Sequence, residues 1–306
     1  MSKRERSYSP GWRRFSTLLL QPLLHILIKQ DMQGRENIPR DGGVILAPNH
    51  LSYADWGTIA LFSYESGRYP TFLIKSSAFD VKVIGTFLRT VGQLPVYRNR
   101  GDAALVLRDA ERALRAGESV IVYPEGTASR DPALWPMKAR TGVARLALAT
   151  GVPVIPIAHW GAQDVLPYGT SRPHLWPRRT VRMVAGPPVD LSAFRDQPLN
   201  SATLRAATDA IMADVTALLA GLRGETAPAV PYDPAAARRA AVRAAGPDGG
   251  PAADDPDDPD DPDDDEGDEG DEGHEGDAAT AGGRGRGRDR GQAGRSDGPE
   301  AEARPT

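Results

Sequence analysis

Short apolar runs alternate with stretches of helical periodicity along most of the chain from Gly42 onward. The runs that predict β-strands span residues 43–47, 71–74, 93–97, 119–123, 152–157 and 180–184. Strands that alternate with helices are typical of an α/β domain whose sheet is mainly parallel. We therefore predict an α/β fold with a mixed, largely parallel sheet flanked by helices.

Two of the predicted helices are clearly amphipathic. The first spans residues 102–116 and ends before Gly117, and the second begins at Ser201 and continues to Leu222. In both, apolar residues recur at intervals of three and four, which places them on one helix face. We expect the second helix to be the last element of the fold.

The N-terminal segment, residues 1–30, combines basic residues with an apolar stretch at 15–28. The stretch is shorter than the roughly 20 apolar residues that cross a bilayer, and no small-x-small cleavage site follows it. A basic, half-apolar segment is typical of a helix that lies in the membrane interface. The alternative is a helix buried against the domain.

The balance of charged residues differs between the two parts of the chain. Residues 1–250 hold 31 Lys and Arg against 21 Asp and Glu, whereas residues 251–306 hold 6 against 20. Segments rich in Asp, Glu, Gly and Pro cannot bury enough apolar surface to order themselves. We expect a folded domain at 31–225 and a disordered acidic, Gly-rich tail at 226–306. An Arg-Gly run at 284–290 is interpreted as a solvated low-complexity end, so no nucleic-acid partner is predicted.

The segment 47–55, Ala-Pro-Asn-His-Leu-Ser-Tyr-Ala-Asp, carries the strongest chemical pattern. His50 and Asp55 would lie about 140° apart on one helix, so they can meet only if His50 is in a loop and Asp55 in the first helical turn. Ser52-x-x-Asp55 fits a capping box and supports that boundary. A histidine held by a carboxylate is suited to act as a general base. The alternative is that Asp55 only caps a helix and His50 only packs.

The same spacing occurs again at His159 and Asp164, so at most one copy need be catalytic. The second copy lacks both the preceding Asn and the Ser at the third position. We therefore prefer the first copy.

Two further segments follow predicted strands: residues 123–127, Tyr-Pro-Glu-Gly-Thr, and residues 92–98, which end in Arg98. Glycine permits close backbone approach to a ligand, and an arginine fork suits a phosphate monoester. The chain has neither a phosphate loop of the GxxxxGK[ST] type nor a GxSxG nucleophile elbow. NTPase and serine-hydrolase functions are therefore disfavoured.

Together these segments resemble the glycerophosphate acyltransferase superfamily, and most of all its 1-acylglycerol-3-phosphate O-acyltransferases, over residues 20–222. Four blocks occur in the family's order, at residues 49–55, 92–98, 123–127 and 152–156. The resemblance departs at Ala128-Ser129-Arg130, where the family usually continues with Arg-Ser directly after Glu-Gly-Thr. Arg130, Lys138 or Arg140 would then replace the shifted arginine.

The resemblance implies that His50 takes the proton of an acceptor hydroxyl while Asp55 holds the imidazole. It assigns five residues to the acceptor phosphate and glycerol: Lys75, Arg98, Glu125, Gly126 and Thr127. Supporting roles fall to Asn49, Ser52, Arg130 and Lys138, and the acyl or thioester pocket to Val152, Pro153 and Pro156.

The implied reaction transfers a fatty acyl group from acyl-CoA or acyl carrier protein to the sn-2 hydroxyl of 1-acylglycerol 3-phosphate. Direct attack agrees with the absence of cysteine from the sequence, and we expect no cofactor and no metal. The implied location is peripheral, on the anionic cytoplasmic face of the cell membrane. The alternatives are another acceptor, such as glycerol 3-phosphate or another lysolipid, and a non-catalytic lipid-binding protein. The acidic tail could also compete with lipid for the basic domain.

Overall fold

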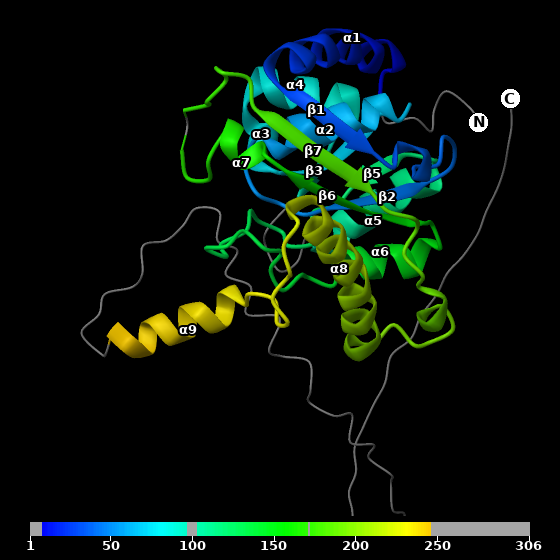
Figure 1. The fold of residues 1–306 in the computed structure, drawn as a ribbon. Coiled ribbons are helices and arrows are strands. Elements are labelled where there is room, and N and C mark those ends of the chain that lie inside the picture. The colour runs from blue at the N-terminus through cyan, green and yellow to red at the C-terminus, as the bar shows by residue number, and fades with distance from the viewer. Residues whose placement is uncertain (1–7, 97–102, 171, 246–306) are drawn as a thin grey trace, which may run out of the picture. The chain divides into compact units, whose positions relative to one another are not determined.

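A computed structural model describes residues 8–96, 103–170 and 172–245 of the chain (Figure 1). The helices are α1 (Pro10–Leu27), η1 (Arg35–Asn37), α2 (Asp55–Glu65), α3 (Ser77–Asp80), α4 (Lys82–Val91), α5 (Ala103–Arg115), α6 (Gly142–Thr150), α7 (Ala162–Val165), η2 (Ser192–Phe194), α8 (Ser201–Arg223) and α9 (Pro234–Ala245). The strands are β1 (Lys29–Gln33), β2 (Val44–Pro48), β3 (Pro70–Lys75), β4 (Leu94–Val96), β5 (Ser119–Ile121), β6 (Val154–Trp160) and β7 (Thr180–Ala185).

In the described parts of the chain the strands form one sheet in the order β1-β7-β6-β2-β5-β3-β4. Neighbours are parallel except β6 and β7, which are antiparallel. The predicted mixed, largely parallel sheet is therefore confirmed. All six predicted strands are present with small shifts at their ends, although Tyr97, the last residue of the third one, lies outside the described residues.

The centre of the sheet is buried on both faces, as a parallel sheet covered by helices requires. In β2, Val44 and Leu46 belong to the cluster that includes α2, while Ile45 and Ala47 belong to the one that includes α5, α6 and α8. Figure 1 shows α1, α2 and α4 on one side of the sheet and α5, α6 and α8 on the other. Alternate residues of one apolar strand thus supply both cores.

Strand β1 was not predicted, because its sequence Lys-Gln-Asp-Met-Gln is polar. It pairs in parallel with β7 at the edge of the sheet, and its side chains alternate between exposed and partly buried. An edge strand can be stabilised by the ladder of its neighbour, and therefore needs no apolar run of its own.

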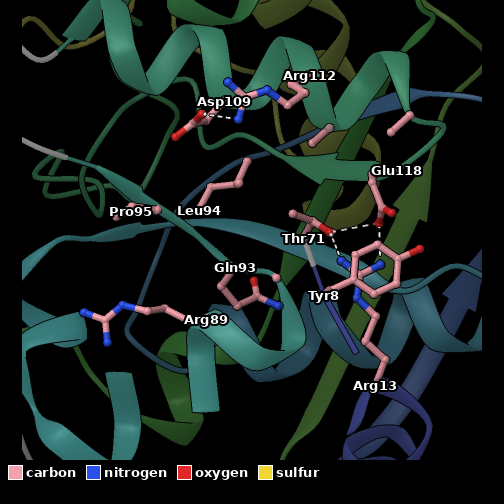
Figure 2. Close-up of a pocket in the computed structure, with 13 residues that line it drawn as sticks. Tyr8, Arg13, Thr71, Arg89, Gln93, Leu94, Pro95, Asp109, Arg112 and Glu118 are labelled. Atoms are coloured by element: carbon pink, nitrogen blue, oxygen red, sulfur yellow. Dashed lines mark hydrogen bonds and ion pairs between the residues drawn. The ribbon is translucent and has the colours of Figure 1, made fainter. Parts of the chain in front are cut away.

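Helix α1 is held against the domain by a polar residue. The Arg13 guanidinium forms an ion pair with Glu118 and donates to the carbonyl of Val91 at 2.8 Å, and Tyr8 lies over it at 3.3 Å (Figure 2). Ser16 is buried on the same face. The helix is therefore neither free of the domain nor buried all round: Arg13 and Ser16 dock on the domain together with Leu24 and Leu27, and the other face is exposed. Across the described segments, none of the helices combines the length and apolar character needed to cross a membrane.

A cavity of about 240 Å³ lies where α1 meets α4 and α5, and Figure 2 shows its lining. Arg13, Thr71 and Glu118 contribute to its wall, and the last two stand at the beginnings of β3 and β5. It therefore opens at the amino ends of these strands, away from the edge that carries the predicted chemistry.

The C-terminal part differs from expectation. Helix α8 matches the predicted final helix, but α9 follows it, so α8 is not the last element. Residues 234–245, within the predicted tail of 226–306, are helical, while residues 246–306 lie outside the described residues. The Lys138 amide donates to the Tyr232 carbonyl at 2.9 Å, and the Lys138 ammonium pairs with Asp233 at 3.3 Å. These contacts tie the segment before α9 to the domain.

Candidate active site

Several of the predicted site residues gather where parallel strands end. His50 follows β2, Lys75 ends β3, and the turn at 123–127 follows β5. Since β2, β3 and β5 are parallel neighbours, their carboxyl ends share one edge of the sheet. Ligands of open α/β sheets bind at that edge.

His50 and Asp55 meet as predicted, with His50 in the loop and Asp55 at the start of α2. His50 Nδ1 lies 2.8 Å from Asp55 Oδ2. Because a carboxylate only accepts, Nδ1 carries the proton, which leaves Nε2 as the nitrogen available to act as a base. The His50 side chain is 19% exposed, whereas that of Asp55 is fully buried. The base is therefore reachable and its partner is not.

Asp55 is held as an anion by its surroundings. Burial alone would raise the pKa of Asp55, but the attraction of His159 and the hydrogen bond from His50 outweigh it, so the pKa is lowered. The amides of Leu51 and Ser52 also donate to Oδ2, at 2.6 and 3.0 Å. Charge-assisted hydrogen bonds of this kind favour the ionised carboxyl.

The capping box at Ser52 and Asp55 forms only in half. Asp55 accepts from the Ser52 amide, but the Ser52 hydroxyl accepts from the Ala54 amide at 2.8 Å instead of that of Asp55. The helix consequently begins at Asp55, with Ala54 as its cap residue. The Asp55 carboxylate therefore binds the His50 loop in addition to its place at the start of the helix.

Glu125 accepts hydrogen bonds from two separate backbone segments, one at His50 and one at Met137. Its Oε1 accepts from the His50 amide and its Oε2 from the Met137 amide, both at 2.9 Å. The Ser129 amide in turn donates to the His50 carbonyl at 2.8 Å. Burial raises the pKa of Glu125 to about 7, against the opposing effect of these two hydrogen bonds. Oε1 fixes the His50 loop and Oε2 fixes the segment at Met137, so a direct role of Glu125 in acceptor binding stays a prediction.

Tyr123 was not singled out as a site residue, yet its ring stacks on that of His50. The ring centroids are 4.3 Å apart with an angle of 29° between the planes. Its position at the head of the 123–127 turn could have indicated this contact only with knowledge that β2 and β5 are neighbours. The stack fixes the plane of the base.

Arg140 is a basic residue that the structure brings to the Gly126 turn. Gly126 has φ +74°, and a Cβ at this position would lie 3.1 Å from Arg140 Nε. Lys138 instead pairs with Asp233, and the amide of Arg130 contacts the sulfur of Met137 at 3.1 Å. Arg140 thus packs directly on the turn, and which of the three candidates replaces the shifted arginine stays a prediction.

The remaining predicted residues fall into three groups. Lys75 is exposed and pairs in register with Val96, while Arg98 lies outside the described residues. Thr127 is partly buried beside Gly126. Val152 and Pro153 precede β6, where the Pro153 carbonyl accepts from the Ile45 amide at 3.0 Å, and Pro156 is buried within it.

The assignment of Val152, Pro153 and Pro156 to the acyl or thioester pocket stays a prediction, and the first two lie away from the base. They lie near the amino end of the sheet, whereas His50 follows its carboxyl end. Their apolar character serves the core, because Val152 packs against the cluster that includes α5, α6 and α8.

The second His–Asp copy does not form a pair of its own. His159 is fully buried in β6 and Asp164 is exposed in α7. The carboxylate that His159 approaches is Asp55, at 3.5 Å. His159 is therefore a residue of the first site that its sequence spacing did not reveal.

Comparison with known proteins finds similarity to acyltransferases. The family model described as Acyltransferase matches residues 29–160, somewhat less than half of the chain. The chain is 33% identical over 145 residues to the chloroplastic 1-acyl-sn-glycerol-3-phosphate acyltransferase of Brassica napus, and this alignment covers 47% of this chain and 40% of that protein. It is 25% identical over 201 residues to the 1-acyl-sn-glycerol-3-phosphate acyltransferase of Bacillus subtilis, and this alignment covers 65% of this chain and 92% of the Bacillus protein.

The crystal structure of the 1-acyl-sn-glycerophosphate (LPA) acyltransferase PlsC from Thermotoga maritima superimposes with a TM-score of 0.54. It is 23% identical and covers 74% of this chain and 86% of that one. This chain has the same fold. The matched part spans only 40% of the length of the Brassica napus relative and 46% of that of a chloroplastic relative from Arabidopsis thaliana. The family match begins at β1 and ends with β6, so it includes His50, Asp55, the 123–127 turn and His159.

Proposed function

We propose that this protein transfers a fatty acyl group from a thioester donor, acyl-CoA or acyl carrier protein, to the sn-2 hydroxyl of 1-acylglycerol 3-phosphate. The product is phosphatidic acid. The observation that carries the proposal is the His50–Asp55 pair at 2.8 Å, on the sheet edge where parallel strands end. The relatives with this printed activity support the choice of acceptor.

The reaction proceeds by direct transfer. His50 Nε2 takes the proton of the acceptor hydroxyl, and the oxygen attacks the thioester carbonyl carbon. The new C–O bond forms, the C–S bond breaks, and the departing thiolate takes the proton back from His50. Asp55 stabilises the imidazolium in between, since its own pKa is lowered. The chain contains no cysteine to carry the acyl group as a thioester. No step requires a metal or a cofactor.

The phosphate of the acceptor would bind basic residues near the base. Lys75 ends β3, which β5 separates from β2, and Arg140 packs over Gly126 in the turn that follows β5. Arg98 follows β4, the neighbour of β3, in sequence. Arginine is suited to a phosphate monoester because its planar fork donates two parallel hydrogen bonds.

The acceptor would reach the site from a membrane surface. The exposed face of α1 presents six large apolar side chains: Trp12, Phe15, Leu18, Leu19, Leu23 and Ile26. Leu18 is 77% and Ile26 is 68% exposed. Such a stripe beside basic residues is typical of a helix embedded in the bilayer interface.

The apolar surface continues toward the base. Helix α1 packs against α2, where Leu24 lies beside Gly57, and the adjacent Trp56 is 54% exposed. Tyr53 is also exposed, in the loop between His50 and Asp55. A lipid acceptor held at this surface would therefore lie close to His50. We propose a peripheral location, on the anionic cytoplasmic face of the membrane.

The reaction is tested by incubating the full chain with radiolabelled acyl-CoA and either lysophosphatidic acid or glycerol 3-phosphate. We expect labelled phosphatidic acid from the wild type and none above background from His50→Ala. His174→Ala removes an exposed histidine and serves as the control. Product from glycerol 3-phosphate alone would change the acceptor, and activity that survives in His50→Ala would refute the base. Lipid binding without transfer would favour a non-catalytic protein.

Membrane attachment is tested by co-sedimentation with vesicles of phosphatidylcholine with and without phosphatidylglycerol. Deleting residues 1–30 would also remove the buried Arg13 and leave Glu118 unpaired, so a substitution on the exposed face is the better test. We expect Leu18→Asp with Ile26→Asp to weaken binding at least tenfold, since each lost apolar side chain contributes about 2 kcal/mol when buried. Unchanged binding would refute the membrane face of α1.

A further inference from the structure

His159 and Asn49 are joined by three hydrogen bonds across the neighbouring strands β6 and β2. The Asn49 side chain accepts from the His159 amide at 2.9 Å and donates to the His159 carbonyl at 3.2 Å. In return, His159 Nε2 lies 2.8 Å from the Asn49 carbonyl. Both residues are buried, so these bonds lie out of reach of bulk water. They extend the pairing of β2 and β6 past Pro48, up to the residue before His50.

The same nitrogen of His159 also faces the carboxylate of the candidate base pair. A carbonyl oxygen can only accept, so Nε2 carries the proton, and this N–H lies 3.5 Å from Asp55 Oδ2. The other ring nitrogen, Nδ1, is buried, and none of the described residues forms a hydrogen bond with it. The hydrogen bonding of the His159 ring is thus directed at the segment that contains His50 and Asp55.

We propose that His159 is a positioning residue for the His50–Asp55 pair, acting through the Asn49 carbonyl and the Asp55 carboxylate. The inference rests on the proposed function. His159 does not exchange a proton with substrate, because it is fully buried and Asp55 lies between it and His50. The Nε2–H of His159 fixes the Asn49 carbonyl at the end of β2 and faces the Asp55 carboxylate. Because His50 follows Asn49 and is held by Asp55, its position depends on both contacts.

The rival explanation is that His159 merely fills the core. An apolar residue of similar volume would then serve equally well. The structure argues against this, because such a residue would leave the buried Asn49 carbonyl without its donor. Residues that orient the ligands of a metal site typically change metal affinity or activity by about 10- to 100-fold, and we expect an effect of the same order here.

The kinetic test compares His159→Leu with His159→Gln. Leucine keeps the bulk without a donor, whereas the amide nitrogen of glutamine can occupy the place of Nε2. We expect His159→Leu to lower kcat about 30-fold with the acceptor KM within about twofold. His159→Gln should restore kcat to within about threefold of the wild type. Ile157→Ala, two residues earlier on the same strand face, is the control: it opens a cavity in the core and should keep kcat.

A spectroscopic readout tests the positioning without reference to turnover. The His50 Nδ1 proton is held by Asp55 and should give a downfield proton resonance, assigned by its loss in His50→Ala. We expect the resonance in the wild type and in His159→Gln, and its loss or broadening in His159→Leu. A wild-type chain without acyl transfer but with this pattern would refute the function and keep the positioning role. An unchanged kcat and resonance in His159→Leu, or no rescue by glutamine, would overturn the inference.

Discussion

Replacing Glu125 by glutamine should change how the stability of the protein depends on pH. Burial raises the pKa of Glu125 from the usual 4.5 to about 7 in the folded state. The folded protein therefore binds this proton more tightly than the unfolded chain. This contribution is fully present below about pH 4.5 and is lost as the pH rises through 7.

The size of the effect follows from the shift. The pKa of Glu125 is about 2.5 higher in the folded state than in the unfolded chain, which corresponds to about 3 kcal/mol of unfolding free energy. The pKa of Asp55 is lowered, so its contribution has the opposite sign and is lost only below the usual range of aspartate. Between pH 5 and 8 we therefore expect the Glu125 contribution to decline by about 3 kcal/mol.

Urea unfolding of the full chain, followed by tryptophan fluorescence at pH 5, 6, 7 and 8, measures this decline. In Glu125→Gln the contribution should be absent, so the free-energy difference between wild type and variant should change by about 3 kcal/mol across the series. Glu36→Gln, at an exposed carboxylate, is the control and should leave the dependence unchanged. A Glu125→Gln variant that follows the wild-type pH dependence would refute the reasoning.

Two further substitutions test the site and the docking of α1. Asp55→Asn keeps the shape but removes the charge that orients the His50 imidazole and stabilises it when protonated, so kcat should fall on the order of 10³-fold in the acyl-transfer assay; a loss below tenfold would contradict this role. Arg13→Met leaves Glu118 with its buried partner removed and should lower the free energy of unfolding by about 3 kcal/mol in urea titrations. An unchanged unfolding midpoint would show that the pair does not hold α1.

The sequence predicted those elements whose pattern is local. The six apolar strands and helices α5 and α8 carry their own periodicity, so their positions followed without knowledge of the fold. Strand β1 depends on β7 for its hydrogen bonds and carries no such pattern. Helix α9 is rich in alanine and arginine, and its neighbours Glu, Gly and Pro suggested disorder instead.

The role of Glu125 could not be obtained from its motif. The turn predicts a glycine with positive φ and a residue near a ligand, and Gly126 does have φ +74°. Whether the carboxylate faces a ligand or the protein depends on where the His50 amide and the Met137 amide lie, and these come from segments 75 residues before and 12 residues after Glu125. Only the packed structure brings both to one carboxylate.

The two His–Asp copies show why spacing alone did not reveal the contact between His159 and Asp55. Each copy lies at the carboxyl end of a parallel strand, and β2 and β6 are direct neighbours. Parallel neighbours bring residues at matching ends into contact whatever their distance in sequence, so His159 meets Asn49 and Asp55, 110 and 104 positions earlier. The register of β2 and β6 therefore decides which aspartate this histidine approaches, and a register is a property of the sheet that a repeated five-residue spacing does not contain.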